Sequence, residues 1–280
     1  MKFALYSNLE IMLIEHGAYF AAEYAKKMGF SGLELVALVD RDAIPDLKEA
    51  QRIKAIMDSY DLLFVCYSVP CNVYHEDVLD EMKKRIEIAA ELGSPYVHHT
   101  LMPGIFLKDS IYEENAISKC VDVAEKIANF ADGYGITCIY EQQGFYVNGF
   151  DNYVLFYDEM KKRCANVGVC ADFGNSLFVG EQPTKLIEKY VSDIKQVHFK
   201  DYITKNTSVN PGLHWRELPN NNWLRNIMVG HGEVEYDKCL KLLKDSGYNG
   251  YYSLELAHPE PFDEGVKQAM EYTERLFNIL

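Results

Sequence analysis

The sequence predicts a single-domain α/β protein, a closed (β/α)8 TIM barrel over residues 1–280. First, an apolar strand, a loop, an amphipathic helix and a glycine follow one another repeatedly along the chain. Second, this pattern yields eight strands, the number that closes such a barrel. Third, no linker rich in Ser, Gly or Pro and no shift in composition divides the chain. An open, doubly wound sheet stays the alternative, because sequence does not show closure.

The strands and helices alternate in a regular order. Apolar residues at helical spacing, such as Tyr19, Ala22, Ala25 and Met28, predict the helices between the strands. Several helices end in a glycine, which takes the left-handed conformation that stops a helix before the next strand. The expected strands are Phe3–Tyr6, Leu33–Val36, Leu63–Tyr67, Tyr96–Thr100, Ile136–Glu141, Gly168–Asp172, Ile194–Lys200 and Tyr251–Glu255.

One connection is longer than the others. About thirty residues, from Tyr202 to His231, separate the seventh strand from the next clear helix, Asp237–Lys244. Loops of this length in compact domains are commonly lids or binding loops. This one contains Trp215 and Trp223, so it is either a binding loop or a surface excursion packed down by its tryptophans.

Composition excludes several classes of protein. The net charge of −14 opposes a phosphate backbone, so we expect no nucleic-acid partner. The seven cysteines form no C-x-x-C pair, and several lie in apolar runs, which favours reduced thiols and a cytoplasmic location. No signal-peptide core follows Met1, and no apolar stretch is long enough to span a bilayer, so we expect no membrane association. A homo-oligomer is compatible with the sequence.

Four neighbouring strands end in candidate metal ligands. Glu141, Asp172, His198 and Glu255 end strands five to eight, whose carboxyl ends meet at one rim of a barrel. Three carboxylates cannot converge there without a compensating positive charge, which a divalent cation supplies. Oxygen ligands with one imidazole suit Mn²⁺, Mg²⁺, Co²⁺ or Zn²⁺. Taken singly, each acid is equally a solvated loop residue or helix cap, and His198 a hydrogen-bonded core histidine.

These motifs, taken together, resemble a known family. The quoted stretches are Gly32-Leu33-Glu34-Leu35, the Glu141 strand, Ala171-Asp172, His198-Phe199-Lys200-Asp201, Gly230-His231-Gly232-Glu233-Val234 and Tyr252-Ser253-Leu254-Glu255. Over nearly its whole length the chain is similar to the sugar phosphate isomerase/epimerase family of xylose isomerase-like barrels. The resemblance implies one divalent metal ion held by Glu141, Asp172, His198 and Glu255.

The resemblance also implies an activity. We expect a metal-dependent isomerase or epimerase of a keto sugar or sugar phosphate, working through an enediolate with Glu141 and Glu255 as the acid–base pair. Further residues at or near strand ends, or in the long connection, are candidate substrate contacts: Lys200, His99, Asn175, Glu34 and Arg216. His98 and His99 point to opposite faces of their strand, so at most one of them lines the cavity.

Three alternatives remain open at the level of sequence. An inosose-type dehydratase would share the chemistry but expel a hydroxyl group. A nuclease like endonuclease IV is disfavoured by the charge and by Asn175, which stands where that group has a metal-binding histidine. A sugar-binding barrel without turnover is disfavoured because all four ligand residues are intact.

Overall fold

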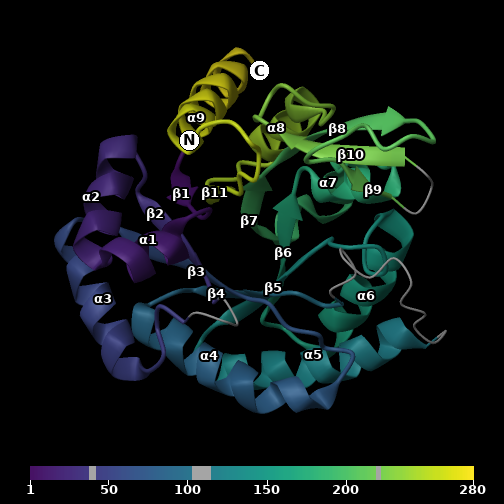
Figure 1. The fold of residues 1–280 in the computed structure, drawn as a ribbon. Helices are drawn as coiled ribbons and strands as arrows, with labels where there is room; N and C mark the ends of the chain where they lie inside the picture. The colour runs from purple at the N-terminus through teal and green to yellow at the C-terminus, as the bar shows by residue number, and fades with distance from the viewer. Residues whose placement is uncertain (38–41, 103–114, 219–221) are drawn as a thin grey trace.

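The chain folds into a closed barrel of eight parallel strands with helices packed around it, as Figure 1 shows. The structure is a computed structural model and describes residues 1–37, 42–102, 115–218 and 222–280. Around the barrel the strands run in the order β1-β11-β7-β6-β5-β4-β3-β2. They are β1 (Phe3–Leu5), β2 (Gly32–Val36), β3 (Leu63–Val69), β4 (Tyr96–His99), β5 (Thr137–Glu141), β6 (Val167–Asp172), β7 (Ile194–Phe199) and β11 (Tyr251–Leu254).

The predicted barrel is therefore confirmed, and every predicted strand is a barrel strand. Pairing of β1 with β11 in parallel register, Ala4 opposite Ser253, closes the sheet and removes the open-sheet alternative. The helices are α1 (Leu9–His16), α2 (Ala18–Met28), α3 (Leu47–Ser59), α4 (Leu79–Leu92), α5 (Ala116–Asp132), α6 (Phe150–Arg163), α7 (Thr184–Tyr190), α8 (Tyr236–Asp245) and α9 (Phe262–Ile279), with short 3-10 turns at Glu76–Val78, Asn175–Val179 and Val191–Asp193.

The helices cover the barrel because each has an apolar face toward the strands. In α2, for example, Ala21, Ala22 and Ala25 are completely buried. Gly29 ends this helix with φ of 90°, the left-handed geometry that lets the chain turn back toward β2. The large core thus lies in the layer between strands and helices, and the strands are free to carry polar groups on their inner faces.

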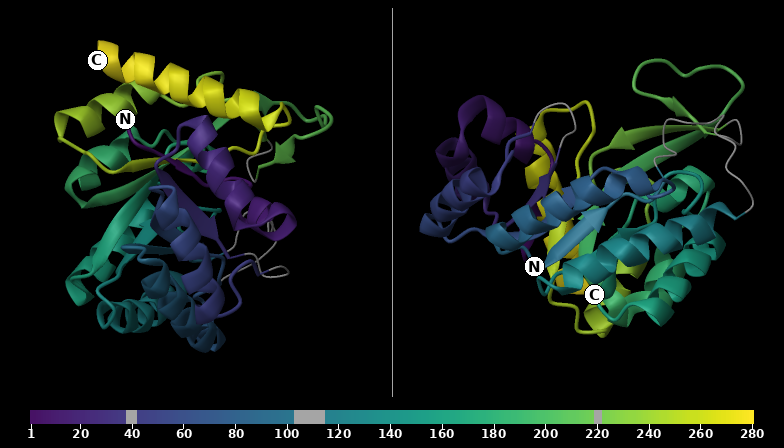
Figure 2. Two further views of the ribbon diagram at one scale, coloured as in Figure 1. Left: turned by 90° about the vertical axis from the view of Figure 1, so that its left-hand side faces the viewer. Right: turned by 90° about the horizontal axis from the view of Figure 1, so that it is seen from below.

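The long connection after β7 is a small antiparallel sheet, not a loop. Strands β8 (Asp201–Asn206), β9 (Arg216–Glu217) and β10 (Asn222–Ile227) pair in the order β8-β10-β9. The indole nitrogen of Trp223 donates a hydrogen bond to the Thr207 carbonyl, at 3.0 Å. The segment projects from one side of the barrel, as both views in Figure 2 show. We call β8, β9 and β10 the excursion sheet.

Asp201 ties the excursion sheet to the barrel. Its buried carboxylate accepts backbone hydrogen bonds from Gly230 and Gly232, at 2.9 and 3.0 Å, and from Tyr202 at 2.9 Å. A Cβ atom on Gly232 would lie 2.1 Å from an oxygen of Asp201, so only glycine permits this approach. The chain leaving β7 and the chain returning to α8 are thereby held together.

We expect the Phe156→Ala variant to lower the free energy of unfolding by about 3–5 kcal/mol, since it opens a cavity between α6 and the barrel. Phe156 is fully buried, and its ring centre lies 5.1 Å from that of Tyr140 on β5. The neighbouring Leu155 is 63% exposed, so Leu155→Ala is the matched control and should change stability by less than about 0.5 kcal/mol. Urea unfolding followed by circular dichroism measures both; similar losses would contradict the assignment of the α6 inner face.

Candidate metal centre and pocket

Four side chains from four neighbouring barrel strands meet at the carboxyl end of the barrel. Glu141, Asp172, His198 and Glu255 each place one potential ligand atom so that all four atoms lie within 4.8 Å of one another. We call them the ligand cluster. The register of the strands brings them together. Asp172 lies opposite His198 on β6, and Ser253, two residues before Glu255, lies opposite His198 on β11. The sequence thus predicted a group that the fold does bring together.

The imidazole of His198 is at the centre of the ligand cluster. Its Nδ1 lies 3.1 Å from Glu141 Oε1, 3.1 Å from Glu255 Oε2 and 3.9 Å from Asp172 Oδ2. Its Nε2 lies 3.0 Å from Glu34 Oε1, on the opposite side of the ring. Glu34 accepts the Nε2 hydrogen and so orients the ring with Nδ1 toward the three other carboxylates, where a bound cation would meet the Nδ1 lone pair.

Glu34 therefore supports the ligand cluster from below. It is completely buried and also accepts hydrogen bonds from the hydroxyls of Ser68 and Ser253 and from the amide of Gln196. Burial alone would raise the pKa of Glu34, but the positive field and hydrogen bond of His198 lower it to about 2. In the structure these partners engage both oxygens of Glu34, and its expected contact with substrate stays a prediction.

Lys200 lies at the edge of the ligand cluster and binds two of its carboxylates. Its ammonium is 2.6 Å from Glu255 Oε1, 3.3 Å from Asp172 Oδ2 and 3.2 Å from Asn175 Oδ1. Lys200 itself is only 5% exposed. Burial opposes the charge, yet Asp172 and Glu255 raise the pKa of Lys200 well above its usual value. The side chain is thus a fixed positive charge within the site.

The ligand cluster still holds more negative charge than its cations balance. Four carboxyl groups, counting Glu34, face one ammonium and one imidazole; three are buried, and the side chain of Glu255 is 21% exposed. Burial and the neighbouring charge of Asp172 raise the pKa of Glu141 to about 8. By contrast Lys200 and His198 overcome the effect of burial on Glu255 and lower its pKa to about 2. The pKa values of these two neighbouring acids are shifted in opposite directions, which indicates that one carboxylate of the site lacks a cation beside it.

The donor set fits a divalent cation. Asp172 Oδ1 accepts the backbone hydrogens of Gly174 and Asn175, at 2.8 and 2.6 Å, whereas its buried Oδ2 accepts no hydrogen bond from the described residues and meets only the ammonium of Lys200, at 3.3 Å, and the ring of His198, at 3.9 Å. Three carboxylate oxygens and one imidazole nitrogen are ligands that Mn²⁺, Mg²⁺, Co²⁺ and Zn²⁺ accept. A divalent metal ion would neutralise the excess charge, and the residues present do not distinguish among these ions.

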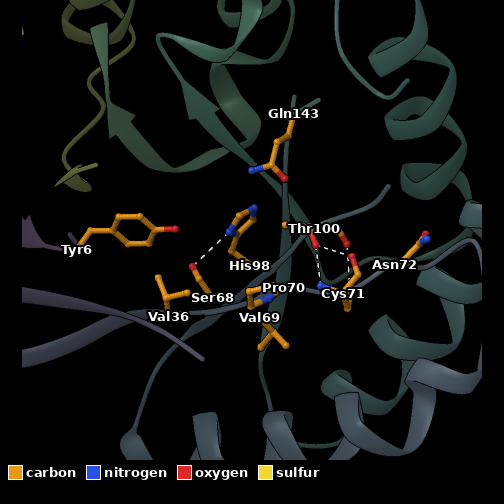
Figure 3. A pocket seen from close by; sticks show the side chains of 10 residues that line it. All are labelled: Tyr6, Val36, Ser68, Val69, Pro70, Cys71, Asn72, His98, Thr100 and Gln143. Carbon is orange, nitrogen blue, oxygen red and sulfur yellow. Dashed lines mark hydrogen bonds between the residues drawn. The ribbon is translucent and has the colours of Figure 1, made fainter. Parts of the chain in front are cut away.

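A cavity of about 420 Å³ opens beside the ligand cluster, over the carboxyl ends of β1 to β5. Its walls include Tyr6, Ser68, Cys71, His98 and Gln143, which Figure 3 shows in close-up. The rings of Tyr6 and His198 are 5.1 Å apart, and His98 Nε2 is 3.4 Å from Glu141 Oε2, so the cavity borders the ligand cluster directly. Its volume suits a small molecule the size of a sugar.

Of the two histidines that end β4, the structure turns His98 and not His99 into this cavity. His98 Nδ1 lies 3.2 Å from Ser68 Oγ, as the dashed line in Figure 3 marks. His99 is buried on the other face, with its ring edge-on to Tyr140 at 5.2 Å. His99 does not line this cavity, and its expected role as a substrate contact stays a prediction. The alternation of side chains along the strand indicates the same orientation, since His99 shares its face with the buried, apolar Val97.

The remaining candidates lie at different distances from the ligand cluster. Asn175 is 1% exposed and touches Lys200, and its Nδ2 has no partner in the described part of the chain. That amide is available to an oxygen of a substrate, so its predicted role stays a prediction. Arg216 lies in the excursion sheet, with its guanidinium carbon 5.6 Å from the centre of the Phe178 ring, and its role as a substrate contact also stays a prediction.

With this geometry established, the family is clear. The family model described as "Xylose isomerase-like TIM barrel" matches residues 22–276, and the chain belongs to that family. An inosose isomerase of Halalkalibacterium halodurans is 23% identical over 90% of this chain and 88% of its own length. An inosose dehydratase of Bacillus thuringiensis is 24% identical over 70% of this chain and 66% of its own length.

Solved structures agree on the fold. A D-psicose 3-epimerase of Clostridium cellulolyticum H10, crystallised with D-tagatose, has a TM-score of 0.75 at 15% identity, covering 99% of both chains. The IolI protein, crystallised with a zinc atom, has a TM-score of 0.75 at 18% identity, covering 100% of this chain and 99% of its own. No helix in the described ranges has the length and apolar character needed to cross a membrane.

We expect Glu34→Gln to weaken the binding of a divalent metal by about 10- to 100-fold, the usual effect of losing the carboxylate behind a histidine ligand. Competition against a fluorescent chelator measures the affinity for Mn²⁺ and Zn²⁺. The exposed Glu264, on α9, supplies the control Glu264→Gln, which removes the same charge and should bind metal like the parent. Equal metal affinity in a folded Glu34→Gln protein would show that Glu34 does not position His198.

Proposed function

We propose that this protein is a divalent-metal-dependent isomerase or epimerase that moves a proton next to the carbonyl of a keto sugar or a related cyclic polyol ketone. The observation that supports this most is the placement of two carboxylates. Glu141 and Glu255 come from strands on either side of β6 and β7, and each has an oxygen 3.1 Å from His198 Nδ1. They therefore approach one small space from two directions, as an acid–base pair requires.

The metal ligands in this proposal are Glu141, Asp172, His198 and Glu255. When bound, the cation supplies polarisation of the substrate carbonyl and stabilisation of the negative charge that develops on it. Lys200 fixes Glu255 by holding its Oε1 at 2.6 Å. Glu255 Oε2, which lies 3.1 Å from His198 Nδ1, would then take a proton from the carbon next to the carbonyl.

Glu141 completes the pair from the other side. Proton return by Glu141 to the opposite face of the same carbon inverts its configuration, which is an epimerisation. Return of the proton to the neighbouring carbon, with the hydroxyl proton passing from one oxygen of the enediolate to the other, instead moves the carbonyl, which is an isomerisation. His98, 3.4 Å from Glu141 Oε2 and 3.2 Å from Ser68 Oγ, is placed to hold a substrate hydroxyl beside this carboxylate.

A dehydratase is the second candidate, and it is favoured by the inosose dehydratases among the relatives. It begins with the same proton abstraction by Glu255, followed by loss of a hydroxyl group from the next carbon. The hydroxyl takes the bonding electrons with it and needs a proton donor, a role that the same second carboxyl group, Glu141, would fill. The two candidates thus share their residues and differ in the fate of the substrate.

The nuclease alternative is less well supported by the site. A further metal ion would need a ligand at the position of Asn175, but its Oδ1 lies 3.2 Å from the ammonium of Lys200. A fixed positive charge at that point repels a second cation. The net charge of −14 also opposes a nucleic-acid backbone.

We expect Glu255→Gln and Glu141→Gln each to reduce turnover by about 10²-fold or more, the usual cost of losing an acid–base group. The assay is conversion of a panel of keto sugars, sugar phosphates and inososes by metal-loaded protein. Glu264→Gln is the control and should retain full activity, because this exposed residue on α9 does not belong to the ligand cluster. Parent-like turnover in either site variant would remove that residue from the mechanism, whereas a parent protein inactive on the whole panel would favour the non-catalytic alternative.

Solvent deuterium separates the two candidate reactions. In D₂O, an epimerase or isomerase acting by carbon deprotonation should place deuterium on carbon and leave the substrate skeleton intact, as mass spectrometry and NMR detect. A dehydratase should yield a product lighter by one water. If the product contained no deuterium at any stage of conversion, the proposed proton transfer through carboxylates that exchange with solvent would be contradicted.

A further inference from the structure

A second cavity lies at the opposite end of the barrel from the ligand cluster. Its volume is about 410 Å³, and its wall includes Lys2, Tyr96, Gln196 and Tyr251, all at or next to the beginnings of barrel strands. Parallel strands begin at one end of a barrel and finish at the other, so this cavity is separate from the pocket of Figure 3. We call it the N-terminal cavity.

The N-terminal cavity is positively charged, although the whole chain carries a net charge of −14. Its lining includes Lys2, Lys54 and Lys195, and one acid, Asp58. The ammonium of Lys54 is paired with Asp58 at 2.6 Å. Lys2 instead lies 4.9 Å from the centre of the Tyr251 ring, and in the described part of the chain no ion pair joins Lys195 to an acid. Two ammonium groups are thus available to an anion.

Gln196 supplies a polar group at the floor of the N-terminal cavity. It is 1% exposed, and its Nε2 donates hydrogen bonds to Glu34 Oε2 and Ser253 Oγ. Because the Glu34 carboxylate can only accept, the amide nitrogen is fixed on that side and the oxygen on the other. The Oε1 atom is buried and has no hydrogen-bond partner among the described residues. A buried acceptor of this kind calls for a donor such as a hydroxyl group.

Two glycines near the beginnings of barrel strands shape this cavity, because they let larger side chains pack directly against the backbone. A Cβ on Gly32 would lie 2.7 Å from the Tyr251 ring, so glycine allows that ring to occupy the inner wall. Similarly, a Cβ on Gly168 would lie 2.6 Å from Cγ of Lys195, whose stem covers the glycine. The two aromatic rings, Tyr96 and Tyr251, give the cavity apolar walls between its charged rim and its amide floor.

We propose that the N-terminal cavity binds a small polyhydroxylated anion, a phosphate or a carboxylate, as a second ligand site. Lys2 and Lys195 neutralise the anionic group, a hydroxyl of the ligand donates to Gln196 Oε1, and the tyrosine rings cover its carbon skeleton. Its volume lies within the range of roughly 300–1,000 Å³ common for small-molecule sites. The site does not depend on the proposed function, since none of its lysines belongs to the ligand cluster.

Titration calorimetry on the full, metal-loaded chain tests the proposal. The probes are glucose 6-phosphate, gluconate and glucose, which share hydroxyl groups but differ in the anion. We expect saturable binding of at least one anion, much weaker binding of glucose, and a loss of about tenfold or more in Lys195→Gln and in Lys2→Gln, the scale of one charged hydrogen bond. Lys84→Gln is the matched control, because exposed Lys84 on α4 carries the same charge and does not line the cavity.

Glutamine at position 195 keeps the stem that covers Gly168, and melting temperatures establish that the variants are folded. If Lys195→Gln were unfolded, Lys2→Gln would decide the question, since Lys2 is exposed. Anion affinity unchanged in folded Lys195→Gln and Lys2→Gln proteins would overturn the proposal. So would the absence of binding by both anions at millimolar concentration, or affinity for glucose equal to that for the anions. Binding lost in Lys200→Met but retained in the cavity variants would place the anion at the ligand cluster and overturn it equally.

Discussion

The hydrogen bond between Glu34 and His198 fixes the geometry on which the rest of the site depends. Both groups are completely buried, and their nearest atoms are 3.0 Å apart. Without this bond the imidazole could rotate, and its Nδ1 would no longer face Glu141, Asp172 and Glu255. The bond also joins β2 to β7 across the barrel. The orientation of the His198 ring therefore depends on the closure of the sheet. Barrel closure and the orientation of one ring are therefore linked.

The two halves of the barrel carry different parts of the site. Strands β5, β6, β7 and the end of β11 supply the ligand cluster, whereas β1 to β4 supply most of the cavity wall. His98 joins the halves, since it contacts Ser68 on one side and Glu141 on the other. Under the proposed function, the charged half would carry out proton transfer while the other half would determine which substrate fits. It is consistent with one fold that serves isomerases, epimerases and dehydratases among its relatives.

Much of the fold and the ligand cluster could be predicted because both follow from local patterns. Each barrel strand has apolar residues on its outer face, and each ligand residue lies where a strand ends. The pattern of apolar residues does not predict the excursion sheet, because most residues of β8 and β10 are half-buried or exposed and the two strands lack an apolar run. The bond from Glu34 to His198 could not be predicted because the two residues are 164 positions apart, and the N-terminal cavity unites lysines from three distant segments.

The interior of the barrel between the two cavities is closed. Cys66, Ile139 and Cys170 form a small, fully buried apolar group, with Tyr96 packed against it from the N-terminal end. Above this group lie Glu34 and the ligand cluster, so the described residues leave the upper pocket as a cup and not as a tunnel. Under the proposed function, substrate and product would then use the same opening, one after the other. Departure of the product through that mouth would be a condition for each new turnover.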